Sequence, residues 1–142
     1  MRLDEDEARA RVAVHDHGVL CTLHAGRGVD AVPVAYAMGE DGFVGVPVDL
    51  VKPKASLRLQ RERNLEADAR ATLLVEHWER DEWSRLWWVR AELLWQGHDA
   101  PQASNLANLL AQRYPQYRDQ PFARVLVFRI VGLTGWAGGE VP

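Results

Sequence analysis

The residues best placed for chemistry lie in the segment 46–64, VPVDLVKPKASLRLQRERN. If a helix begins near residue 52, then Lys54, Arg58 and Arg61 follow one another at i, i+4 and i+7 on one helix face. Three cations close to a helix N-terminus are suited to bind a phosphate or another dense anion. The alternative is a solvated helix face with local ion pairs such as Arg58–Glu62.

Tryptophans are the second candidate feature. Trp87 and Trp88 are neighbours in an expected strand, so their side chains point to opposite faces. One of them could fill the interior while the other covers a subunit interface or a flat ligand, or both could simply pack. Trp136 follows the last expected strand in a glycine-flanked tail, where an exposed aromatic ring suggests a partner surface or a stacked ligand.

Other common sites have little support. The sequence contains no GxGxxG or Walker loop, no G-x-S-x-G elbow, and no CxxC or HExxH zinc motif. His15 and His17 flank Asp16 at an expected helix end, and we interpret them as surface histidines rather than metal ligands. Cys21 lies in mid-strand, and we interpret it as a small core residue rather than a nucleophile. We therefore expect no metal site and name no catalytic acid or base.

The bulk composition limits the class of protein. A chain of 142 residues is expected to form a single domain, residues 1–142. The net charge of −3 argues against general nucleic-acid binding. The single cysteine excludes an intramolecular disulfide and fits a reducing cytoplasm. Neither a signal-type apolar segment nor a membrane-spanning run is present, so we predict a cytoplasmic protein that binds no membrane.

The elements that must position these residues are mostly strands. Hydrophobic patterning predicts helices at 4–16, 52–65 and 100–113, the last one capped by Asp99, and six strands at 19–25, 29–38, 43–48, 71–78, 85–96 and 124–134. Pro33 suggests an edge strand or a bulge, because proline donates no ladder hydrogen bond. Meandering strands with short helices predict a mainly β (α+β) antiparallel barrel or sandwich rather than a parallel sheet.

Several motifs together resemble a known family. They are Val32-Pro33-Val34, Lys52-Pro53-Lys54, the segment 83–91 (WSRLWWVRA) and Gly135-Trp136. The chain resembles the pyridoxamine 5′-phosphate oxidase-like flavin and deazaflavin oxidoreductases over most of its length. It is most similar to the actinobacterial branch that depends on a deazaflavin, coenzyme F-420. The resemblance implies a six-stranded antiparallel split β-barrel, a fold typical of FMN-binding proteins.

The resemblance also implies a homodimer with two cofactor sites at the subunit interface. The phosphate would be held by Lys54 and Arg58, with Lys52 and Arg61 assisting. The cofactor ring would be lined by residues of two strands and bordered by tryptophans, partly from the other subunit: Val32, Pro33, Val46, Pro47, Val48, Trp87, Trp88 and Trp136.

The implied activity is hydride transfer between bound F-420 and a small organic acceptor. One alternative is an FMN-dependent oxidase or reductase, because both cofactors carry a phosphate and a tricyclic ring. Another is a non-enzymatic protein that binds flavin or haem. Haem would require an axial ligand, for which His24 and His77 are the candidates.

Overall fold

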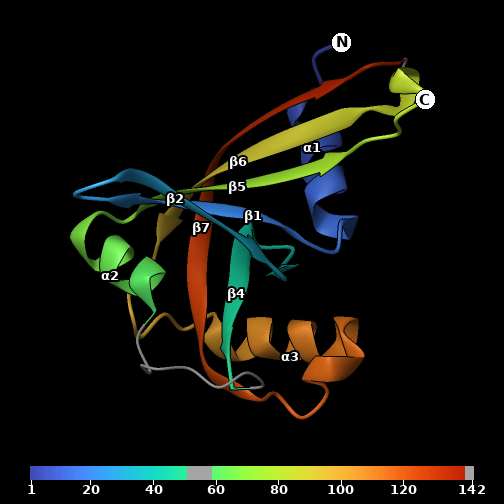
Figure 1. Ribbon diagram of the computed structural model, residues 1–142. Coiled ribbons are helices and arrows are strands. Elements are labelled where there is room, and N and C mark those ends of the chain that lie inside the picture. The colour runs from blue at the N-terminus through green and yellow to red at the C-terminus, as the bar shows by residue number, and fades with distance from the viewer. Residues whose placement is uncertain (51–58, 140–142) are drawn as a thin grey trace.

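A single antiparallel sheet of seven strands organises the computed structural model, which describes residues 1–50 and 59–139 (Figure 1). The strand order is β2-β1-β5-β6-β7-β4-β3, with β2 and β3 at the two edges, so the sheet is not closed. The strands are β1 Gly18–His24, β2 Gly28–Val34, β3 Ala37–Met38, β4 Phe43–Asp49, β5 Arg70–His77, β6 Trp87–Trp95 and β7 Phe122–Ala137.

The long strand β7 joins two parts of this sheet. Its first half pairs with β4, from Phe122 beside Asp49 to Arg129 beside Phe43. Its second half pairs with β6 as far as Ala137, beside Trp87. The sheet therefore divides into a five-stranded layer, β2-β1-β5-β6-β7, and a shorter layer, β7-β4-β3, which share one strand (Figure 1).

In the described residues three helices pack on the sheet: α1 Glu5–Val14, α2 Gln60–Ala67 and α3 Ala103–Arg113. Helix α1 contacts β7, β6 and β3, α3 contacts β7, β4 and β3, and α2 contacts β1. Two short 3₁₀ turns, η1 Trp83–Arg85 and η2 Pro115–Tyr117, are the other regular elements of residues 1–50 and 59–139. None of the helices in the described residues has the length and apolar character needed to cross a membrane. The cytoplasmic location and the absence of nucleic-acid binding stay predictions.

The core lies between the two layers and the helices. Its fully buried side chains include Leu20, Leu73, Val89 and Phe128 from the sheet. Tyr36 is also fully buried, and its hydroxyl donates a hydrogen bond to the carbonyl of Val12 in the last turn of α1. Burial raises the pKa of Tyr36 well above its ordinary value. The buried phenol thus joins α1 to the sheet.

The predicted mainly β, antiparallel α+β architecture is confirmed, but the predicted number of six strands was wrong, because the sheet has seven. The apolar run 29–38 forms two strands, β2 and β3, which pair with β1 and β4 respectively. The chain changes partner where Tyr36 turns into the core. Pro33 lies on β2, an edge strand, as its missing N–H predicts.

The predicted start of the basic helix was also wrong. Helix α2 begins at Gln60, and Leu59 before it is extended. The N–H of Leu59 donates to the Glu62 carboxylate, at 2.8 Å to Oε2, which satisfies a donor at the helix start. Of the three stacked cations, α2 contains only Arg61. The others, Lys54 and Arg58, lie outside the described residues, as does Lys52.

The second expected cap was wrong as well. Helix α3 begins at Ala103 with Gln102 at the N-cap position, so Asp99 does not cap it.

Candidate functional site

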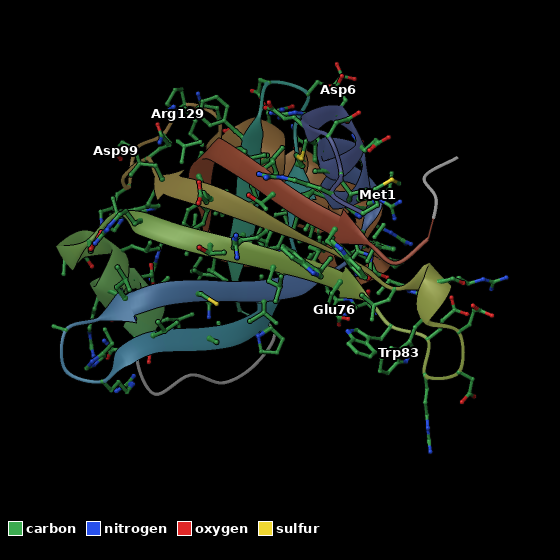
Figure 2. The ribbon with its side chains drawn as sticks, turned by 90° about the horizontal axis from the view of Figure 1, so that it is seen from above. Met1, Asp6, Glu76, Trp83, Asp99 and Arg129 are labelled. Carbon is green, nitrogen blue, oxygen red and sulfur yellow. The ribbon has the colours of Figure 1, made fainter. Side chains whose placement is uncertain are left out.

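The five-stranded layer has one face that is open to solvent. Along β6, the buried Val89, Ala91 and Leu93 alternate with Arg90 and Glu92, which are exposed. The buried set belongs to the same core cluster as residues of α1 and α2, so these helices lie on the inner face. Figure 2 looks onto the other face, and no helix passes in front of its strands.

This outer face carries many apolar side chains, interspersed with charged ones such as Glu76, Arg90 and Glu92. The strand register places half-buried or exposed apolar side chains on it: Val19, Leu23, Val29, Pro33, Leu74, Trp88 and Trp136. Val29 is 62% exposed and Trp136 is 40% exposed. Large apolar areas of this kind on a protein surface are typical of a binding or subunit interface.

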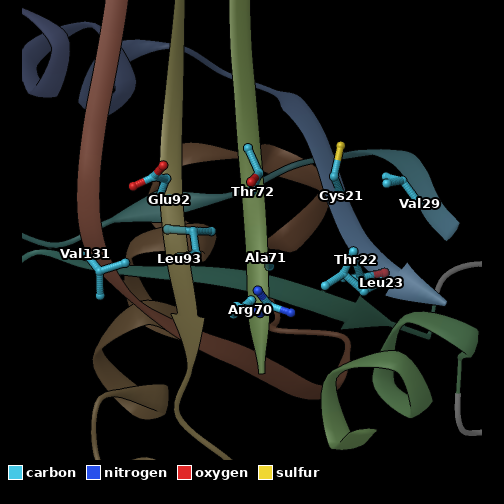
Figure 3. Close-up of a pocket in the computed structure, with 10 residues that line it drawn as sticks. All are labelled: Cys21, Thr22, Leu23, Val29, Arg70, Ala71, Thr72, Glu92, Leu93 and Val131. Atoms are coloured by element: carbon cyan, nitrogen blue, oxygen red, sulfur yellow. The ribbon is translucent and has the colours of Figure 1, made fainter. Parts of the chain in front are cut away.

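A shallow hollow of about 380 Å³ lies in this face (Figure 3). Its lining includes Cys21, Thr72 and Glu92 from three neighbouring strands. Cys21 is half-exposed here, so its interpretation as a core residue was wrong. Burial nevertheless raises the pKa of its thiol, which disfavours the reactive thiolate. The raised pKa of the thiol therefore gives no support to a nucleophilic role for Cys21.

Two tryptophans lie side by side at one end of the outer face. Trp88 of β6 stands directly opposite Trp136 of β7 in the strand register. The guanidinium of Arg90 lies over the Trp88 ring, 5.5 Å from its centroid. The prediction that Trp136 lies in a tail was wrong, because the residue belongs to β7. Its partial exposure agrees with the prediction of an exposed ring. The pair offers two adjacent aromatic surfaces for a flat ligand or a partner.

Trp87 points to the opposite, inner face. Its ring meets His15 edge-on at 5.2 Å between centroids, stacks on His77 at 6.4 Å, and lies under the guanidinium of Arg11 at 5.0 Å. In one chain Trp87 and Trp88 therefore cannot border the same ring, in line with the alternation expected from the sequence.

Two exposed tryptophans near this end were not among the residues predicted for the site. Trp78 is 58% exposed and Trp83 is 64% exposed, and their rings meet edge-to-face at 5.6 Å between centroids. The charged loop between them was a usable signal, because a tryptophan on either side of a solvated loop has little core to join.

The other end of the layer is polar and carries α2. Asn64 of α2 donates from Nδ2 to the hydroxyl of the buried Thr22 in β1 and to the carboxylate of Asp30 in β2, both at 2.9 Å. Asp30 in turn accepts two hydrogen bonds from Arg27. This network fixes α2 to the β1–β2 hairpin.

Arg61 sits among acids at the start of α2. Burial lowers its pKa, while the nearby carboxylates of Glu62 and Asp49 act in the opposite direction. Among the described residues, neither Nε of Arg61 nor Oδ1 of Asp49 has a hydrogen-bond partner, although both are buried. The hydroxyl of Tyr117 lies 3.4 Å from the other oxygen of Asp49. These acids compensate the charge of Arg61. Arg61 is therefore less suited to bind a phosphate than an exposed cation without acidic neighbours would be.

The expected ring-lining residues are not brought together in one chain. Val46 and Val48 are 0% and 1% exposed in the core, and Pro47 between them is also buried. Val32 stands opposite Leu20 and faces the core, whereas Pro33 is exposed on the outer face. Of this set, only Pro33 shares the outer face with the tryptophan pair, three strands away.

The two ends of the layer lie far apart within one chain. Strand β5 runs from Arg70, beside Leu94, to Glu76, beside Trp88. Six residues at the rise of a strand separate these points by about 20 Å. The chain enters β5 directly from α2, so the α2 end and the tryptophan end are on opposite sides of the layer (Figure 1).

The two candidate haem ligands differ in availability. His24 accepts hydrogen bonds at Nδ1 from the backbone N–H groups of Gly26 and Arg27. Nε2 of His77 lies 3.1 Å from the Glu79 carboxylate, and the side chain is 45% exposed. His24 is therefore held within its turn, while His77 is accessible beside the tryptophans.

Comparison with protein-family models gives no match, and comparison with curated proteins gives none either. The structure, however, is similar to many solved structures. One is a conserved hypothetical protein from Mycobacterium tuberculosis, with a TM-score of 0.73 and 19% identity over 96% of this chain and 86% of that one.

Two further similar structures carry a stated ligand or role. An FMN-binding protein from Syntrophomonas wolfei has a TM-score of 0.65 and 16% identity, over 93% of this chain and 85% of that one. The heme storage protein HutZ from Vibrio cholerae has a TM-score of 0.64 and 15% identity, over 94% of both chains. At these identities the similarity establishes the fold: this chain has the split-barrel-like α+β fold found in flavin- and heme-binding proteins.

Proposed function

We propose that the protein is an oxidoreductase that binds coenzyme F-420 between two copies of the chain and transfers hydride to or from a small organic acceptor. The observation that carries this proposal is the outer face, which no described helix covers (Figure 2), with α2 at one end of the layer and the Trp88–Trp136 pair at the other. The FMN-binding protein of the same fold supports a cofactor with a flavin-like ring.

The distance between the two ends favours a dimer. A cofactor bound within one subunit would have to span about 20 Å between the tryptophan pair and the α2 end. This distance is longer than the linker that joins ring and phosphate in a flavin. A two-fold related copy, packed face to face, would bring the tryptophans of one chain to the basic end of the other. The homodimer with sites at its interface therefore explains why these features lie apart.

The residues have distinct roles in this proposal. Lys54 and Arg58 hold the phosphate, Lys52 adds positive charge, and Arg61 mainly orients the start of α2. Trp88 and Trp136 cover the ring, joined by Pro33 on the same face. Binding energy from the phosphate end is remote from the reacting carbon and helps to hold the ring in a productive orientation. The cofactor, when bound, supplies the hydride chemistry.

A paired titration with F-420 and with FMN tests the proposal, followed by tryptophan quenching and by ring fluorescence. We expect tighter binding of F-420. Loss of one charge-assisted phosphate contact in Lys54→Ala should weaken binding about 10- to 100-fold. Arg129→Ala, which removes an exposed cation on β7, is the control and should bind as wild type. An unchanged dissociation constant for Lys54→Ala would contradict the phosphate assignment.

The same titrations separate the alternatives. Tight binding of FMN alone would make the protein an FMN-dependent oxidase or reductase. A haem-binding role is favoured by the similarity to HutZ and by the exposed His77. It would give a Soret band on haem titration that is lost in His77→Ala.

A further inference from the structure

The turn between α1 and β1 brings together three side chains that can bind a metal ion. In His15, Asp16 and His17, one ligand atom from each residue lies within 4.8 Å of the others. Bonds of 2.0–2.2 Å place neighbouring ligands of a tetrahedral zinc ion about 3.4 Å apart. Modest side-chain rotations would therefore bring the three atoms onto one ion.

The backbone of this turn is fixed from outside. The guanidinium of Arg113, at the end of α3, donates hydrogen bonds to the carbonyls of Ala13, at 3.3 Å, and His15. The hydroxyl of Tyr114 donates to the carbonyl of Asp16. Because these bonds already order the main chain, metal binding would need to order only side-chain torsions, which lowers its entropic cost.

Aromatic rings surround the turn, and the guanidiniums of Arg11 and Arg113 lie nearby. His15 packs edge-on against Trp87 and lies 5.4 Å from the His17 ring, between centroids. His77, with Glu79 bonded to it, stacks on the same Trp87. Two of the five histidines of the chain, His15 and His77, thus contact Trp87, and His17 lies beside His15. The site is separate from the outer face that carries Trp88.

We propose that His15, Asp16 and His17 bind one divalent transition-metal ion of the zinc class per chain, at the junction of α1 and β1. Two imidazoles and a carboxylate favour Zn²⁺, Ni²⁺ or Cu²⁺ over Mg²⁺ or Ca²⁺, which prefer oxygen ligands. Nδ1 of His17 now lies 2.5 Å from Oδ1 of Asp16, so this pair opens when the ion enters. Water completes the coordination.

Calorimetric titration of the full chain with ZnCl₂, after chelator treatment and without a histidine tag, tests this proposal. We expect one Zn²⁺ per chain and at least a tenfold loss of affinity in the double variant His15→Ala/His17→Ala. His17→Ala alone is the second variant, because its side chain is 69% exposed and its loss leaves the packing of Trp87 intact. His98→Ala, a surface histidine facing Glu66, is the matched control and should bind as wild type.

A second readout uses Trp87. Cu²⁺ quenches nearby indole fluorescence, so titration with CuCl₂ should quench wild type more than Trp87→Phe. Wild-type zinc affinity in both histidine variants would overturn the proposal. So would the absence of binding heat with wild type up to about 1 mM zinc. These measurements are independent of F-420 and FMN, so their failure is distinguishable from failure of the proposed function.

Discussion

Two neighbouring leucines of β5 show how differently the two faces of the sheet are used. Leu73 is fully buried in the core, between the sheet and the helices. Leu74 points to the outer face, where it stands beside Val19 and Arg90 and is only half-buried. Both residues are leucines of one strand, and both are paired with β1 and β6, so the difference in burial reflects what covers each face.

The comparison separates the residues that hold the fold from those that we expect a partner to cover. The inner face is covered by elements of the same chain and needs nothing more. The outer face keeps apolar side chains such as Val29 and Trp136 in contact with water, which the hydrophobic effect disfavours unless another surface covers them. The outer face is therefore where we expect the second copy and the cofactor.

The largest expected effect on unfolding is at Leu73. Leu73→Ala removes a fully buried side chain and leaves a cavity, which should lower the free energy of unfolding by about 3 kcal/mol. Urea denaturation of wild type and variant at equal protein concentration measures this loss. A loss below about 1 kcal/mol would mean that the inner face is not the closed core described here.

A smaller loss is expected at Glu62, which is 0% exposed and bonded to Arg124, with Nη2 of Arg124 3.0 Å from Oε2 of Glu62. Glu62→Gln should lower the free energy of unfolding by about 2 kcal/mol. This is less than for a fully buried ion pair, because the Arg124 side chain is 31% exposed and partly screened by water. Glu40→Gln, at an exposed turn, serves as the control.

Glu62 also gives a pH dependence. Burial favours the neutral acid, but the hydrogen bonds from Arg124 and Leu59 outweigh it and hold the pKa of Glu62 below its ordinary value of 4.5. The stabilisation is therefore fully present above that value and is lost as the pH falls through the lowered folded pKa. Wild type should lose more stability than Glu62→Gln as the pH falls below about 4.5. Parallel pH curves for the two proteins would rule out this role.

The smallest effect on the single chain is expected at Leu74. Leu74→Glu places an acid beside Arg90 on the open face and should change the free energy of unfolding of the monomer by about 1 kcal/mol or less. In the proposed dimer, however, the new charge would be buried. We therefore expect a shift from dimer to monomer by sedimentation velocity and weaker cofactor binding. An unchanged dimer would place the interface elsewhere.

Local sequence predicted most strands, and its failures have identifiable physical causes. The apolar run 29–38 looks continuous, and only the burial of Tyr36 under α1 divides it between β1 and β4. The start of α2 depends on the buried pairing of Glu62 with Arg124, which is 62 positions away. Contacts of that range leave no periodic pattern in the sequence.

The candidate site shows the same limit. Alternation in a strand predicted that Trp87 and Trp88 face opposite sides, and the structure agrees. Trp136 was placed in a tail because glycines flank it, yet pairing with β6 keeps it in β7. Val46 and Val48 face the core. A short apolar run does not predict this orientation, because such a run fits a strand buried on either face.

The shared strand β7 also has a consequence for biosynthesis. Strands β4 and β6 both pair with it, and it is translated after all the other strands. The two layers therefore cannot be joined while the chain is still emerging from the ribosome as far as residue 121. Until then β4 and β6 keep unpaired edges, which are sites of aggregation in nascent chains. Chaperone protection during synthesis should matter more for this protein than for one built from local hairpins.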